Sequence, residues 1–228
     1  MRLNLSSQIV FNKVPEEFYN PKTAVERSEI TREEHIPTDI YQTVDEGAAR
    51  IADAIVAEIK AKEMLGKYCV LGLGTGQSLT PVFNELIQRY EQKQVSFANV
   101  VVFNAYEYFP LSPDSQHSAI SQLRDRFLSH VDIPEQNVYT LDGTIAQEAV
   151  QSHCRLYEQR IQTFGGIDVM LLGIGRIGNI ATNEPGSTLT SPARIILIDA
   201  TSREEMTMSF GSQEPVPPCS ITLGKPTY

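Results

Sequence analysis

Cysteine is rare in this sequence, and long apolar runs are missing. The 228 residues contain three cysteines that are far apart, Cys69, Cys154 and Cys219, and this pattern favours a reducing, cytoplasmic compartment over a disulfide framework. No apolar run approaches the ~18 residues of a membrane-spanning helix, and the first residues lack the apolar stretch of a signal peptide. Without a Cys-x-x-Cys or His-x-x-x-His pair the sequence predicts no metal site, and it predicts no cofactor.

Basic residues are also scarce. The chain has 19 Lys and Arg against 28 Asp and Glu, which gives a net charge of −9. Nucleic-acid binding needs a basic face for the phosphates, so we expect no nucleic-acid partner. A small local pocket for an anion stays compatible with this charge. With 41% hydrophobic residues, the chain can form the core of one medium domain.

The pattern of apolar residues changes near residue 43. Residues 1–42 contain Pro15, Pro21 and Pro37 among polar residues and show no sustained periodicity, so we predict an irregular N-terminal arm. Residues 43–228 are predicted to form the domain. Thr43 to Glu46 has the form of a capping box, which marks the start of a helix.

The domain alternates amphipathic segments with short apolar runs. Apolar residues at the helical period predict helices over 43–66, 79–90, 120–128 and 149–161. Short apolar runs predict strands over 68–71, 100–103, 138–141, 167–172 and 194–198. This alternation is typical of an α/β fold, a three-layer domain with a mostly parallel sheet. Such sheets bind ligands at the carboxyl ends of their strands.

The first predicted strand leads into the glycine-rich segment 72–78 (GLGTGQS). Free backbone N–H groups before a helix favour an anion, and the glycines let the backbone approach it closely. The segment lacks the Gly-Lys-Ser/Thr ending of the nucleotide P-loop. A tight turn without a ligand is the alternative. As candidate phosphate-binding residues we take Gly74, Thr75, Gly76, Gln77 and Ser78.

A second glycine pattern follows the strand that ends at Leu172. Gly173 to Gly178 matches Gly-x-Gly-x-x-Gly, and Asp199 closes the next strand where an acidic ribose ligand would be sought. This pattern supports an NAD-dependent oxidoreductase as an alternative. Pro185 and Pro192 weaken it, because a dinucleotide site needs a well-formed helix after the glycines.

Four segments in this order resemble the glucosamine-6-phosphate deaminase/isomerase family. They are the first glycine segment, Phe103 to Tyr108 (FNAYEY), Gly173 to Gly178 and Asn183 to Ser187 (NEPGS). The resemblance extends over residues 43–224, and the Asn-Glu-Pro element favours the deaminases over the related 6-phosphogluconolactonases. It implies the fold described above and a small-molecule sugar phosphate as ligand.

The family's chemistry opens the sugar ring, moves a proton between C1 and C2, and releases ammonia. By resemblance its proton-transferring Asp falls at Tyr106, its ring-opening His at Asn179, and the supporting Asp at Ile177. A phenol with a pKa near ~10 is a poor base at neutral pH. The resemblance therefore leaves Glu184, Glu107 and Tyr106 as the candidate catalytic residues. Other candidates for the substrate pocket are Asn104, Gly175 and Asn179, and no histidine is assigned a role.

Two further family features are altered. By resemblance a phosphate-binding Arg falls at Met208, and a phosphate-binding Lys and the last strands would lie beyond the end of this chain. A shortened sheet exposes an edge that needs cover. The arm or a second copy in a homo-oligomer would provide it.

Three functional hypotheses remain open. The first is a deaminase/isomerase-family protein that binds a hexosamine phosphate such as glucosamine 6-phosphate. The second is a non-catalytic sugar-phosphate sensor or regulatory subunit, suggested by the replaced catalytic positions. The third is the NAD-dependent oxidoreductase.

Overall fold

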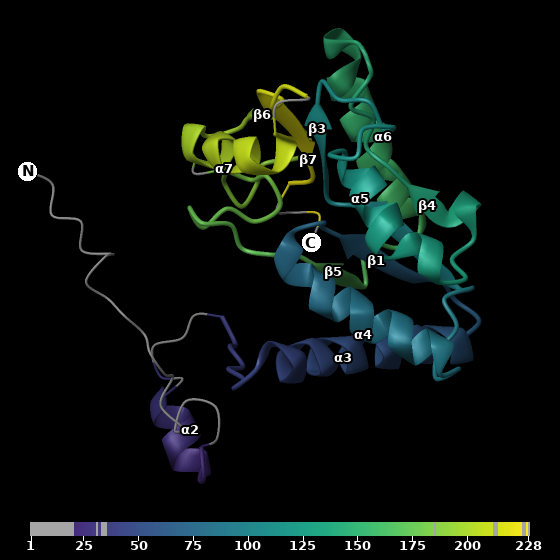
Figure 1. Cartoon of the computed structure of the whole chain (residues 1–228). Coiled ribbons are helices and arrows are strands. Elements are labelled where there is room, and N and C mark those ends of the chain that lie inside the picture. The colour runs from purple at the N-terminus through teal and green to yellow at the C-terminus, as the bar shows by residue number, and fades with distance from the viewer. Residues whose placement is uncertain are drawn as a thin grey trace, which may run out of the picture. The chain divides into compact units, whose positions relative to one another are not determined.

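The computed structural model describes residues 21–30, 32, 36–184, 186–211, 214–224 and 227 (Figure 1). It divides into two compact units, residues 1–50 and residues 51–228. Much of the predicted arm, residues 1–20 above all, lies outside the described residues. The predicted boundary between residues 42 and 43 stays a prediction.

The first unit contains a helix that apolar periodicity does not indicate, α2 (Ala24–Ile30). It begins with a capping box, because Thr23 Oγ1 accepts from Glu26 N at 3.1 Å and Glu26 Oε2 accepts from Thr23 N at 3.2 Å. The predicted box at residues 43–46 is confirmed in the same way, with distances of 3.2 and 3.4 Å. It begins α3 (Val44–Met64), which continues into the second unit.

The second unit holds the predicted parallel sheet. Its strand order is β4-β2-β1-β5, and every pairing is parallel. The strands are β1 (Cys69–Leu73), β2 (Val100–Asn104), β4 (Val138–Tyr139) and β5 (Val169–Leu171). The central strands β1 and β2 are buried along their whole length. The predicted α/β class with a mostly parallel central sheet is confirmed.

A second, antiparallel sheet accompanies the parallel one. Its order is β3-β7-β6, with β3 (Tyr106–Phe109), β6 (Arg194–Leu197) and β7 (Cys219–Thr222). The apolar run at 194–198 therefore forms a strand as predicted, but in this smaller sheet. Strand β3 is separated from β2 by Ala105 alone, so the chain leaves one sheet and enters the other within a residue.

The predicted helices of this unit are present. They are α4 (Thr80–Glu91), α5 (Ala119–Arg126) and α6 (Val150–Thr163). Single 3₁₀ turns occur at Gln77–Leu79, Leu128–His130, Glu135–Asn137 and Gln147–Ala149. One buried cluster joins both sheets to α6, with Val70, Val101, Phe103, Phe109, Cys154, Tyr157 and Ile221 among its members.

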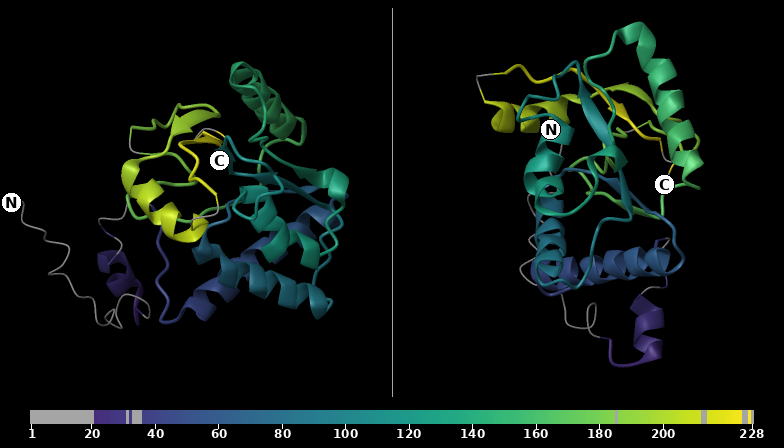
Figure 2. Two further views of the ribbon diagram at one scale, coloured as in Figure 1. Left: turned by 45° about the horizontal axis from the view of Figure 1, so that its top comes forward. Right: turned by 90° about the vertical axis from the view of Figure 1, so that its right-hand side faces the viewer.

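Helix α7 (Ala200–Phe210) is not predicted by apolar spacing. Its ends explain it: Asp199 accepts from Thr201 N at 2.8 Å as the N-cap, and Gly211 at the C-cap has a positive φ of 63°. Figure 2 shows α7, in yellow, beside the three-stranded sheet. The side chain of Asp199 is therefore used in capping, not presented to a ribose.

The cysteines form no disulfide in the structure. All three cysteines are free, and burial raises the pKa of Cys69 to about 12 and that of Cys154 to about 11. No helix among the described residues is long and apolar enough to cross a membrane.

Candidate functional site

A cavity of about 890 Å³ lies at the carboxyl ends of β1 and β5. The glycine segment after β1 and the segment after β5 form two of its walls, and α5 and α7 contribute others. Its lining includes Gly74, Thr75, Gly76, Gln77, Ser78, Tyr106, Tyr108, His117, Asp125, Arg126, Gly173, Gly175, Arg176, Asn179, Glu184, Ser202, Glu205 and Phe210. All five candidate phosphate-binding residues are in this list.

The first glycine segment is held in place by its neighbours. Gly74 N donates to Leu171 O at 2.9 Å, which ties the segment to β5. The two glycine segments touch at Ser78, because a Cβ added to Gly173 would lie 2.8 Å from Ser78 Oγ. Only a residue without a side chain allows this approach. The close contact brings the two sequence motifs into one site.

The second glycine segment folds back on itself. Gly175 N donates to Asn179 O at 2.8 Å, and short antiparallel bridges join Ile174 to Ile180 and Ile180 to Asn183. Among the described residues from 173 to 199 no helix forms. The NAD alternative needs a helix there to face the pyrophosphate, so this geometry does not fit it.

Tyr106 contacts the first glycine segment through its hydroxyl group. Its hydroxyl lies 2.7 Å from Thr75 Oγ1, and both residues are buried. Burial is the main cause that raises the pKa of Tyr106, partly offset by hydrogen bonds to Thr75 and Tyr108. Burial also raises the pKa of Tyr108 well above its usual value. Both phenols are therefore neutral at pH 7.

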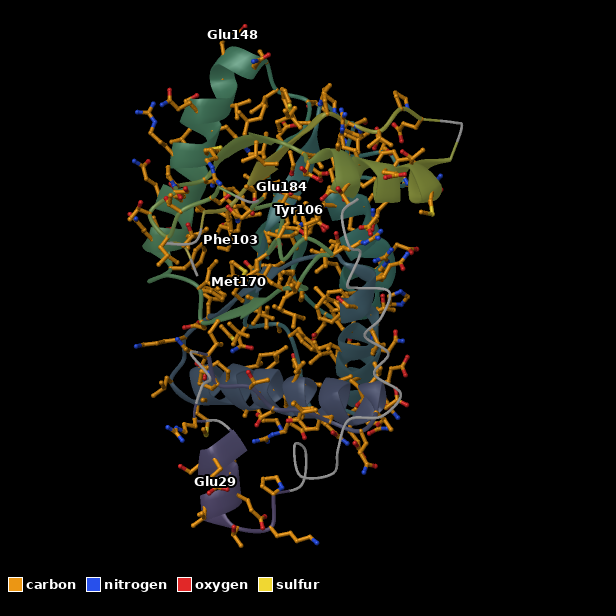
Figure 3. The ribbon with its side chains drawn as sticks, turned by 90° about the vertical axis from the view of Figure 1, so that its left-hand side faces the viewer. Glu29, Phe103, Tyr106, Glu148, Met170 and Glu184 are labelled. Carbon is orange, nitrogen blue, oxygen red and sulfur yellow. The ribbon has the colours of Figure 1, made fainter. Side chains whose placement is uncertain are left out.

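Glu184 is the unsatisfied group of the site (Figure 3). Both of its carboxylate oxygens are buried, and among the described residues neither has a hydrogen-bond partner. Burial raises its pKa; the backbone of Asp199 and the side chain of Ser202 offset this in part, without a hydrogen bond of good geometry. A buried carboxylate without partners is costly, so it favours a ligand that brings donors or positive charge.

Glu107, a candidate catalytic residue, lies outside the cavity lining. It is 2% exposed, and its carboxylate accepts from Ala119 N at 2.8 Å, Ile120 N at 3.0 Å, and Ser118 Oγ at 3.1 Å. Tyr108 N donates to it as well, at 2.9 Å. Burial raises its pKa, and these four donors counter the shift. The side chain satisfies the N-terminus of α5.

Asn104 also points away from the cavity. Its Oδ1 accepts from Leu141 N at 2.8 Å and from Tyr157 Oη at 2.9 Å, and its Nδ2 donates to Tyr106 O at 3.0 Å. These bonds join β2 to the segment after β4 and to α6. The two remaining pocket candidates, Gly175 and Asn179, do line the cavity.

Several residues of the cavity were not among the candidates predicted from the sequence. The His117 ring stacks on Phe210 with centroids 4.2 Å apart. Arg176 pairs with Glu205 at 3.3 Å. Arg126, at the end of α5, donates from Nη1 to Thr75 O at 2.7 Å. Each reaches the cavity through a fold contact between distant segments, which single-residue patterns do not reveal.

The described residues offer no cluster for a metal ion. No group of three or more His, Cys, Asp or Glu side chains among them is placed to hold one. The chemistry available is that of three carboxylates, two neutral phenols, one imidazole, two guanidinium groups and backbone N–H groups.

A family model of glucosamine-6-phosphate isomerases and 6-phosphogluconolactonases matches residues 42–216. A glucosamine-6-phosphate deaminase-like protein of Bacteroides thetaiotaomicron is 51% identical over 227 residues, which cover 100% of this chain and 34% of the relative. The chain thus spans about a third of that protein's length. A glucosamine-6-phosphate deaminase of Geobacillus is 37% identical over 180 residues, 79% of this chain and 69% of the relative.

Solved structures give the same picture. A monomeric glucosamine-6-phosphate deaminase of the NagB superfamily superimposes with a TM-score of 0.76 at 32% identity, over 82% of this chain and 75% of its own. A 6-phosphogluconolactonase from Trypanosoma brucei gives a TM-score of 0.65 at 19% identity, over 84% of this chain and 78% of its own. The second likeness is one of fold.

Proposed function

The chain belongs to the family of glucosamine-6-phosphate isomerases and 6-phosphogluconolactonases, and we propose that it binds a hexosamine phosphate in the cavity between β1, β5 and α7. The phosphate lies against the backbone N–H groups of residues 75–78. The amino sugar extends toward Glu184 and Asn179. The chemistry of the walls supports this orientation, since the glycine segment offers donors and Glu184 offers an acceptor.

The observation that carries the proposal is the unpaired carboxylate of Glu184. Its two buried oxygens lack hydrogen-bond partners among the described residues, although the side chain lines a cavity large enough for a sugar phosphate. An ammonium group with neighbouring hydroxyls supplies the missing donors and the compensating charge. The unpaired carboxylate therefore supports an amino sugar as the ligand.

Calorimetric titration tests this proposal. We expect saturable binding of glucosamine 6-phosphate, weaker binding of glucose 6-phosphate, and loss of that preference in Glu184→Gln. Glu148→Gln is the matched control, because Glu148 is an exposed acidic residue outside the cavity lining. If the folded wild-type chain binds no hexose or hexosamine phosphate, the proposal is wrong.

A second candidate function is binding without turnover, as in a sensor or regulatory subunit. The observation that favours it is the pair of Tyr106 and Thr75, 2.7 Å apart. Proton transfer between C1 and C2 requires a base, and a buried phenol with a raised pKa stays protonated at pH 7. By resemblance Tyr106 falls at the position of the family's proton-transferring Asp, so its protonation supports ligand binding better than isomerisation.

An ammonia assay separates the two candidates. For a non-catalytic binder we expect calorimetric saturation with glucosamine 6-phosphate and no ammonia above a no-protein blank. The restoring variant Tyr106→Asp, combined with Ile177→Asp and Asn179→His, supplies the replaced groups and serves as the comparison. Ammonia release by the wild-type chain that Glu184→Gln abolishes would instead support a deaminase in which Glu184 transfers the proton.

A further inference from the structure

Arg126 is the last residue of α5, and its side chain reaches the first glycine segment. Its Nη1 donates to the main-chain carbonyl of Thr75 at 2.7 Å. A guanidinium group carries five N–H donors in one plane, so this bond orients the group and leaves other donors available. Arg126 lines the cavity together with residues 74–78.

The charge of Arg126 acts inside the cavity. It contributes a lowering influence on the pKa of both Tyr106 and Tyr108, against the larger effect of burial. Its positive charge is therefore felt at the hydroxyl end of both phenols, beside the glycine segment. No acidic side chain pairs with Arg126 among the residues that the structure describes.

The other basic side chain that lines the cavity already has an acidic partner. Arg176 pairs with Glu205 at 3.3 Å, and its side chain is 71% exposed. The wall also carries Asp125 and Glu184, and the whole chain has a net charge of −9. A phosphate dianion entering this cavity meets several carboxylates, so backbone N–H groups alone leave its charge poorly compensated.

We propose that Arg126 is the phosphate-binding cation of the site. Its remaining N–H groups donate to a phosphate held by the backbone of residues 75–78, while the bond to Thr75 O holds the guanidinium beside that backbone. This proposal rests on the proposed sugar-phosphate binding and names the side chain responsible for its charge recognition. Met208, the position where the resemblance aligns a phosphate-binding Arg, is 82% exposed and absent from the cavity lining.

The first test compares Arg126→Gln with Arg124→Gln by calorimetric titration with glucosamine 6-phosphate. Arg124 is on the same helix but pairs with Glu135 and is not part of the cavity lining. Because a charge-assisted bidentate contact is lost, Arg126→Gln should weaken binding about ten- to a hundredfold. Arg124→Gln should stay within about twofold, since it changes the net charge equally without touching the ligand.

A second measurement separates charge recognition from loop support. Arg126→Lys keeps the charge, so it should recover part of the affinity, and inorganic phosphate should compete with the sugar phosphate in the wild type and the Lys variant but poorly in the Gln variant. A merely structural role would weaken glucosamine without its phosphate as much as glucosamine 6-phosphate. That result would overturn the proposal.

These outcomes also distinguish the proposed role of Arg126 from the proposed sugar-phosphate binding on which it rests. If the wild type binds no sugar phosphate, both are wrong; if it binds and Arg126→Gln binds equally well, only the role of Arg126 is wrong. If Arg126→Gln does not fold, the role of Arg126 can still be tested in the wild-type protein by NMR. Its Arg126 Nε resonance, identified by its loss in Arg126→Lys, should shift on addition of inorganic phosphate, and an unchanged resonance at saturation would contradict the proposal.

Discussion

The hydroxyl oxygens of Tyr106 and Thr75 lie 2.7 Å apart, and this contact joins the glycine segment after β1 to the first residue of β3. Both residues are buried, and either hydroxyl can be the donor. Arg126 binds the carbonyl of the same Thr75. Thr75 is thus held through its side chain by a neutral phenol and through its backbone by a cation.

Removing the phenol oxygen of Tyr106 tests how much this contact contributes to the free energy of unfolding. Tyr106→Phe keeps the ring but leaves the buried Thr75 hydroxyl without its partner. We expect a loss of about 1 kcal/mol in the free energy of unfolding, measured by urea denaturation. Tyr139→Phe is the control, because Tyr139 contributes ring stacking on Phe103 that the variant retains. Equal losses in both variants would argue against a specific role for the Tyr106 hydroxyl.

Glu184 should make stability depend on pH. Burial raises its pKa in the folded chain above the ordinary value of 4.5. Between these two pKa values the folded state binds more protons than the unfolded state, so stability falls as pH rises through this window. Glu184→Gln removes that term, and its melting temperature relative to wild type should increase as the pH rises above 4.5. A difference that does not change with pH would contradict the shift.

Glu107 should matter for folding more than for ligand binding. Four donors converge on its carboxylate, two of them backbone N–H groups at the start of α5. Glu107→Gln leaves one oxygen as acceptor, so we expect a loss of about 2 kcal/mol in unfolding free energy. The control is Glu135→Gln, at an exposed ion pair, which should cost well under 1 kcal/mol.

Ligand affinity gives the second readout for Glu107. The folded Glu107→Gln chain should bind glucosamine 6-phosphate within a few-fold of wild type, because the carboxylate does not line the cavity. A large loss of affinity without a loss of stability would mean that Glu107 contacts the ligand after all, as the resemblance suggests.

Gly175 and Asn179 should be energetically coupled. A Cβ on Gly175 would collide with the Asn179 side-chain amide, so Gly175→Ala forces that side chain to move within the cavity wall. We expect Gly175→Ala to weaken glucosamine 6-phosphate binding, and to do so much less in an Asn179→Ala background. A double-mutant cycle of calorimetric affinities measures the coupling, which should be about 0.5–3 kcal/mol. Additive effects would show that the two residues act independently.

The covalent order of the chain was sufficient to predict the parallel sheet. Apolar runs of four to six residues between amphipathic segments can bury both faces only in a covered sheet, and β1, β2 and β5 form where these runs occur. The glycine segments could also be recognised from the sequence, because the backbone conformations that require glycine depend on the residues at those positions. The helix α7 was not, because its support comes from its capped ends and not from an apolar stripe.

The segment Phe103 to Tyr108 (FNAYEY) shows what the sequence could not predict, because its side chains point to different parts of the structure. Side chains alternate along a strand, so β3 directs Tyr106 and Tyr108 to the cavity and Glu107 to the opposite side, beneath α5. Without knowing that these residues form a strand of the second sheet, the three side chains could be grouped as one catalytic motif. Asn104, at the end of β2, is held away from the cavity by its bonds to Leu141 and Tyr157.

The sequence by itself determined the α/β class, the two glycine segments and the family to which the chain belongs, because each depends on residue types at short spacing. The tertiary structure alone decided which side chains share the cavity. Arg126 meets Thr75 across 51 positions of the chain, and Tyr106 meets it across 31. Such meetings depend on how strands and helices pack, and a buried carboxylate left without partners at Glu184 becomes visible only when every neighbour is in place.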